Sequence, residues 1–242
     1  MRSCRKAIPA PPWHVGSPAG SVEPHGRRRR PGPQMTIYHR PLLAAPTIRD
    51  RHGAPIPFGR RWGQDGPPES SYSVTSHRQR FAALHVVADA LIAHLIRTYV
   101  VIAEDVAADL QPFGNSPRIL RSISLTPAGG RGAPLLFGFS DFPGIRLRSG
   151  ALGDAAFPAC GCDACDETWS DQADRLEREV LAVAGGTLDE RVTDRRVSIA
   201  YTYPDGSSAS EGSVEDYSAA DLERARGLLA AAPGGWEPWP RR

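Results

Sequence analysis

The chain has 242 residues, of which 40% are hydrophobic, and a formal net charge of +2. This length suits one ordinary domain with flanking segments, and no apolar run reaches the roughly 18 residues of a membrane span, so a soluble protein without a membrane partner is expected. Residues 77–242 carry more acidic than basic side chains, which argues against a specific nucleic-acid surface in the folded part.

The first 34 residues are rich in proline, glycine and arginine and have no periodic apolar pattern. Such a segment buries too little surface to offset the entropy of ordering, so residues 1–34 are predicted to be a disordered basic tail. Two interpretations stay open: Met35, where this composition ends, is the native start, or the tail is genuine and Arg27–Arg30 contact polyanions non-specifically. The N-terminus also lacks the apolar core of a secretory signal, so a cytoplasmic location is expected. Repeated prolines predict an irregular segment over residues 35–76.

Residues 77–242 have the patterning of a single domain. Apolar residues recur at helical spacing from Phe81 to Ile102, which predicts a central helix. Apolar and polar residues then alternate in three short segments. This alternation predicts a meander of three antiparallel strands over residues 119–125, 135–139 and 145–147.

The rest of the chain adds helices and strands in a mixed order. A second helix is predicted from Trp169 to Val183, with acidic residues in its first turn. Two further strands are predicted over 188–192 and 197–203, and a last helix begins at Ser218. The order α-β-β-β-α-β-β-α predicts an α+β fold, in which a mostly antiparallel sheet of about five strands packs against two to three helices.

Three of the four cysteines lie within six residues of one another, as Cys160, Cys162 and Cys165. In a reducing compartment, clustered cysteines serve as metal ligands or redox thiols more often than as structural disulfides. The spacing therefore predicts a structural zinc site, or a site for another soft metal, that ties the meander to the second helix. An iron–sulfur cluster ranks below zinc because it normally needs four cysteines and Cys4 lies in the predicted tail.

A closed zinc site needs a fourth ligand. The candidates are His77, His85 and His94 near or on the first helix, and the local carboxylates Asp163 and Asp166. At about 100° per residue, His85 and His94 point to nearly opposite sides of the helix. The helix geometry therefore predicts that at most one of the three histidines can join a single site.

Thiol redox or sensor chemistry is the alternative for the same cysteines. Cys162 and Cys165 would form the exchanging pair and Cys160 would resolve it. The acidic residues around the cluster raise thiol pKa values more than the helix end lowers them, so without a cation the thiols are expected to be poor nucleophiles.

Other chemistry is sparse in the sequence. It contains no nucleophile elbow, phosphate-binding loop, dinucleotide fingerprint or zinc-protease motif, so a non-enzymatic role is favoured. Asp189-Glu190 is interpreted as a solvated strand edge rather than an acid–base pair. Trp236 and Trp239 are expected to dock on the domain's own core, and a protein-interaction module that offers them to a partner is the second alternative.

The segment Phe157-Pro158-Ala159-Cys160-Gly161-Cys162-Asp163-Ala164-Cys165 resembles the hallmark of a family of small proteins from high-GC bacteria, catalogued as a domain of unknown function. Asp141-Phe142-Pro143-Gly144 and the Trp-Glu-Pro-Trp-Pro-Arg ending are similar to the family as well. The resemblance covers roughly residues 77–241. It implies a single soluble domain and brings no activity, substrate or cofactor.

Overall fold

The computed structural model describes residues 37–44, 47–106 and 117–242. The predicted tail of residues 1–34, together with Met35 and Arg27–Arg30, lies outside the described residues. The fold is α+β, as the sequence predicts. Its helices and strands are, in chain order, α1 Ala83–Thr98, β1 Val101–Val106, β2 Ile119–Pro127, β3 Leu135–Ser140, β4 Ile145–Ser149, β5 Gly153–Phe157, α2 Trp169–Ala184, β6 Leu188–Val192, β7 Arg196–Tyr203, β8 Gly206–Ser213 and α3 Ala219–Ala231.

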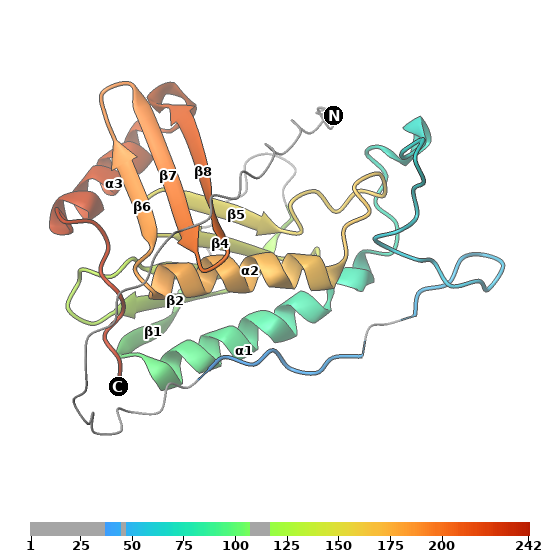
Figure 1. Cartoon of the computed structure of the whole chain (residues 1–242), viewed down its shortest axis with the longest axis horizontal. Coiled ribbons are helices and arrows are strands. Elements are labelled where there is room, and N and C mark those ends of the chain that lie inside the picture. Colours follow the sequence, from blue (N-terminus) through green and yellow to red (C-terminus); the bar gives the residue numbers. More distant parts are fainter. Residues whose placement is uncertain (1–36, 45–46, 107–116) are drawn as a thin grey trace, which may run out of the picture.

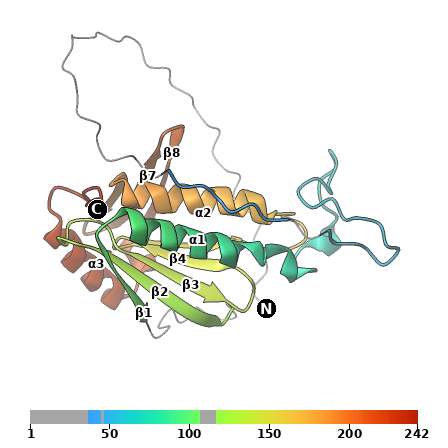
Figure 2. The ribbon, with the colours of Figure 1, turned by 90° about the horizontal axis from the view of Figure 1, so that it is seen from below.

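The strands form two antiparallel sheets. A five-stranded sheet has the order β1-β2-β3-β4-β5, and a three-stranded sheet has the order β6-β7-β8. The helices α1 and α2 lie side by side over one face of the large sheet, and the small sheet packs against α2 through β7, with α3 against β6 (Figures 1 and 2). The connection from β5 to α2 leads from the edge of the large sheet into the helix layer, and it contains the three cysteines.

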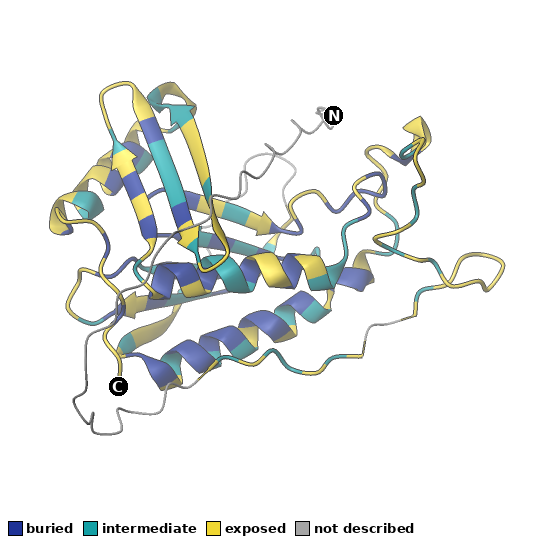
Figure 3. Cartoon of the chain, viewed as in Figure 1, coloured by how far each residue is buried: buried dark blue, intermediate teal, exposed yellow. Residues whose placement is uncertain are grey.

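One continuous core lies between the large sheet and the two long helices. Alternate residues of the central strands point into it, so Phe137 and Phe139 of β3 and Leu147 of β4 are 0–1% exposed. Leu91 of α1 and Leu176 of α2 are fully buried opposite them. Buried residues recur along both helices (Figure 3). Burial of each such side chain contributes about 2 kcal/mol to the free energy of folding.

The described residues form more strands than the sequence pattern predicts. The helix predicted to reach Ile102 ends at Thr98, because Tyr99 takes an extended backbone, and the β-branched residues that follow enter β1. The strands β5 and β8 consist largely of glycine, alanine and serine, which have weak strand propensity. They form because they pair with β4 and β7, and a periodicity analysis cannot detect such tertiary pairing.

Within the described ranges, one helical stretch is long and apolar enough to cross a membrane by length and composition alone. It runs from Arg78 to Thr98 and includes α1. Leu84, Leu91 and Leu95 along this stretch are fully buried in the protein core. We therefore interpret it as a core helix.

The C-terminal segment packs against the core, as expected for its two tryptophans. Trp239 is 2% exposed and donates from Nε1 to the carbonyl of Ala133 at 2.9 Å. Trp236 donates to Oε2 of Glu190 at 2.8 Å. Gly186, which follows α2, leaves room for the C-terminal segment. A Cβ at this position would lie 2.4 Å from the backbone nitrogen of Pro238. The interaction-module alternative loses its basis, since the tryptophans that it would offer to a partner are buried.

Stability is expected to depend on pH through Glu179 of α2. Burial raises the pKa of Glu179 to about 7, although Arg175 lowers it in part. The folded pKa lies above the unfolded one, so the protonated carboxyl stabilises the fold fully below about pH 4.5. This contribution, up to about 3 kcal/mol, is lost as the pH rises through 7.

Urea unfolding at pH 5 and pH 8 measures this dependence. Glu179→Gln should be more stable than wild type at pH 8 and have a flatter pH profile. Glu223→Gln, at an exposed position of α3, is the matched control and should follow wild type. If Glu179→Gln had the wild-type profile, Glu179 would not be the titrating group.

Candidate metal centre

The three cysteines lie together in the loop between β5 and α2. Their sulfur atoms all lie within 4.8 Å of one another, and the Sγ atoms of Cys162 and Cys165 are 3.4 Å apart. Cys162 is buried, whereas Cys160 and Cys165 are exposed, and no disulfide links the three. The loop thus presents three soft donors at one point near the surface.

The local sequence explains how the loop turns. Gly161 has a φ of +74°, and a Cβ there would lie 2.7 Å from the ring of Phe142. Only glycine fits this close passage without strain. The carboxylate of Glu167 accepts hydrogen bonds from the backbone N–H of Cys160 and Gly161 at 3.3 and 3.0 Å, and from the side chain of Gln172 at 3.1 Å. Glu167 therefore closes the loop onto the start of α2.

Arg61, from the proline-rich segment before α1, holds the far side of the loop. Its backbone N–H donates to Asp166 at 2.9 Å, its Nε also contacts that carboxylate, and its Nη2 donates to the carbonyl of Asp163 at 2.7 Å. The guanidinium lies 4.4 Å from the ring centre of Phe58 and 4.9 Å from that of Trp62. Figure 1 shows this segment beside the loop that precedes α2.

Arg80 is the second cation that holds the loop. It is 3% exposed, and its Nη2 donates to the carbonyl of Gly161 at 3.0 Å. Its Nη1 lies 3.5 Å from the Asp163 carboxylate, which also accepts from the backbone N–H of Ser76 at 3.1 Å. Burial lowers the pKa of Arg80, and the Asp163 charge opposes this effect.

Arg61 and Arg80 are the residues that sequence reasoning missed. Both are far from the cysteines in the chain, and only the acidic residues beside the cysteines hinted that nearby cations were needed. Their ion pairs offset the negative charge of Asp163 and Asp166, so these carboxylates oppose thiolate formation less than the sequence alone predicts.

The three thiols differ in acidity. Partial burial raises the pKa of Cys160 and raises that of Cys165 to about 11. Burial also acts to raise the pKa of Cys162, but hydrogen bonds from the Cys160 thiol and from the backbone of Cys165 and Ala164 outweigh it, so the net shift is downward. Cys162 is thus the first of the three to become a thiolate.

The three candidate histidines are not members of the group of close ligand atoms, and each makes other contacts. His85 donates from Nε2 to the carbonyl of Gly144 at 3.1 Å, and burial lowers its pKa. His94 is buried, with its ring centre 5.4 Å from that of Tyr38, and His77 packs edge-on against Phe58. The helix geometry predicted that at most one of these histidines could join the site, and none belongs to the close group of ligand atoms among the described residues.

The candidate carboxylates are engaged as well. Asp163 and Asp166 bind the two arginines described above. In the part of the chain that the structure describes, the group of mutually close ligand atoms therefore contains the three sulfurs and no histidine or carboxylate.

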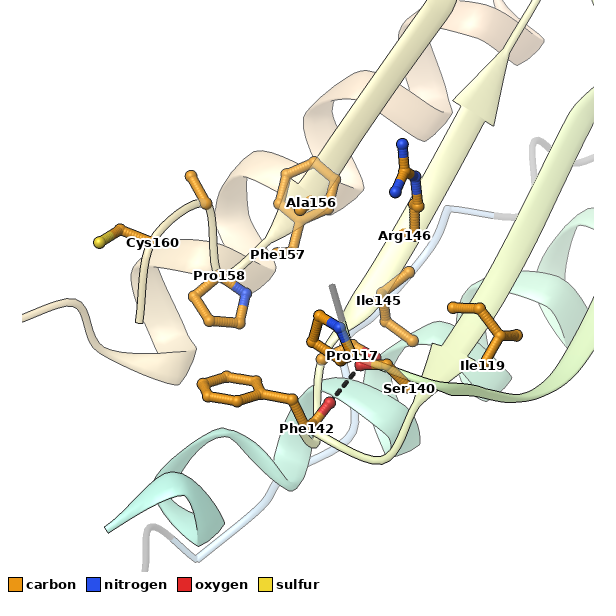
Figure 4. Close-up of a pocket in the computed structure, with 12 residues that line it drawn as sticks. Pro117, Ile119, Ser140, Phe142, Ile145, Arg146, Ala156, Phe157, Pro158 and Cys160 are labelled. Atoms are coloured by element: carbon orange, nitrogen blue, oxygen red, sulfur yellow. Dashed lines mark hydrogen bonds between the residues drawn. The ribbon is translucent and has the colours of Figure 1, made fainter. Parts of the chain in front are cut away.

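An apolar groove of about 230 Å³ lies next to the cysteine loop, and the 158–160 segment forms part of its lining. Phe142, Ile145, Phe157 and Pro158 line it (Figure 4). Cys160 borders this groove as well, and its sulfur also belongs to the thiol cluster. In Figure 4 the sulfur points away from the other lining side chains.

The chain belongs to a family of unknown function (DUF6226), whose model matches residues 44–242. This confirms the resemblance drawn from the cysteine segment and extends it toward the N-terminus from residue 77 to residue 44, so that it includes Arg61. No curated protein and no solved structure matches the chain.

Proposed function

We propose that Cys160, Cys162 and Cys165 bind one soft metal ion, with Zn²⁺ as the leading candidate, and that the ion fastens β5 to α2. The main support for this proposal is that the three sulfur atoms lie close together. Sulfurs bound tetrahedrally to one zinc ion at about 2.3 Å lie about 3.8 Å from one another, and the three sulfurs here all lie within 4.8 Å of one another. Thiolates are the donors that soft metals prefer.

The surroundings of the loop favour a structural role. Glu167 closes the loop from one side, and the two arginines hold it from the other. A metal bound there would join the edge of the large sheet to the helix layer. We further propose a cytoplasmic, reducing compartment, in which the thiols remain available as ligands.

Metal analysis of protein purified under reducing, chelator-free conditions tests the proposal. Wild type should carry about one zinc ion per chain, and Cys162→Ser should carry almost none, because the variant lacks the buried ligand. Cys4→Ser removes the cysteine that the sequence places far from Cys160–Cys165 and should keep the wild-type metal content. Wild type without stoichiometric metal, or equal loss in both variants, would contradict it.

Thiol redox chemistry is the second candidate, favoured by the 3.4 Å separation of the Cys162 and Cys165 sulfurs. Joining them in a disulfide releases two protons and passes two electrons to an oxidant such as a disulfide of low molecular weight. Thiol titration against a glutathione redox buffer tests this function. Thiols that stay reduced over the whole cytosolic range would exclude it.

A further inference from the structure

We infer that this metal site is an open one, with three protein sulfurs and a fourth position that faces solvent and accepts a small-molecule thiolate. The inference rests on the proposed function, because it concerns the same ion. A metal ion with an exchangeable fourth ligand can bind a ligand from solution, whereas an ion with four protein ligands cannot.

The exposure of the sulfur-bearing residues is the first observation. Cys162 is 4% exposed and anchors the site from the protein side. Cys160 and Cys165 are both exposed, so an ion held by all three sulfurs lies at the surface. The side of the ion opposite Cys162 is therefore accessible from solution.

The engagement of the nearby donors is the second observation. Asp163 and Asp166 are bound by Arg61 and Arg80. Glu167 directs one carboxylate oxygen to the backbone of the loop and the other to Gln172. Bringing one of these groups to the metal would break several hydrogen bonds, each contributing about 1 kcal/mol or more. An external ligand meets no such cost.

The chemistry of the site selects a thiolate as that ligand. A zinc ion already bound by three sulfurs is a soft acceptor, and thiolates are the soft ligands of the cytosol. The two arginines offset the carboxylates beside the loop, which reduces the repulsion of an incoming anion.

Cobalt-substituted protein tests the inference, because Co²⁺ occupies zinc sites and each bound thiolate adds sulfur-to-metal charge-transfer absorption. The full-length protein is loaded in thiol-free buffer and titrated with 2-mercaptoethanol. The expected result is a saturable rise of about one third in that absorption, as three thiolates become four. Cys4→Ser should respond as wild type does.

The outcomes separate the two proposals. Charge-transfer absorption that is present but unchanged by the added thiol would overturn the open site and leave metal binding intact. A lower starting absorption in Cys4→Ser, or a cobalt-dependent dimer in sedimentation, would also overturn it, since the chain or a second copy would then fill the fourth position. Absence of any charge-transfer absorption would instead overturn metal binding itself.

Discussion

Removal of the metal is expected to lower the free energy of unfolding of the wild-type protein by about 4 kcal/mol. An ion that binds only the folded chain adds this much when its free concentration is a thousand times its dissociation constant. For a chain of this size the midpoint of thermal unfolding should fall by about 10 °C. Calorimetry of the reduced protein with and without a chelator measures the shift.

The Cys162→Ser variant provides the control for this prediction. It lacks the buried ligand, so its unfolding midpoint should already be low and should not respond to the chelator. A wild-type midpoint that is unchanged by the chelator would show that no ion supports the fold. A chelator effect of equal size in Cys162→Ser would show that the ion lies elsewhere.

Replacement of Glu190 by alanine is expected to cost about 4 kcal/mol of the free energy of unfolding. Glu190 of β6 is 7% exposed. Its carboxylate accepts from the backbone N–H of Ala151, Leu152 and Gly153 and from the Trp236 indole, at 2.7–3.1 Å. Alanine would leave four buried donors without an acceptor, and each such donor costs about 1–3 kcal/mol when it finds no other partner.

Urea unfolding of two further variants makes this prediction specific. Glu190→Gln keeps one acceptor oxygen and should lose less stability than Glu190→Ala. Asp189→Ala, at the exposed neighbouring position, should stay within about 0.5 kcal/mol of wild type. A similar loss in Asp189→Ala would mean that β6 is sensitive to any change and that the carboxylate of Glu190 has no special role.

Much of the fold could be predicted because burial imposes periodicity on the sequence. The spacing of Phe81, Leu84 and Leu91 gave the first helix, and alternation gave the strands around Phe137 and Leu147. The strands β5 and β8 could not be found this way, since their small residues form strands only through pairing with neighbours. For the same reason Glu190 was interpreted as solvated, although long-range packing buries it.

The candidate site was only half predictable. The close spacing of Cys160, Cys162 and Cys165 brings their sulfurs together almost regardless of the fold, so the sequence alone indicates the cluster. Arg61 contacts the loop across 102 residues of chain and Arg80 across 81 residues, and no local sequence pattern indicates such contacts. The sequence could also not tell that Asp163 and Asp166, two of its candidate fourth ligands, are bound by Arg61 and Arg80.

The most direct test of the metal site is a crystal structure of the reduced protein with diffraction data collected on both sides of the zinc absorption edge. We expect one anomalous difference peak that lies about 2.3 Å from each of the Sγ atoms of Cys160, Cys162 and Cys165. A map without a peak at that point, or a disulfide of about 2.05 Å between Cys162 and Cys165 in its place, would contradict it.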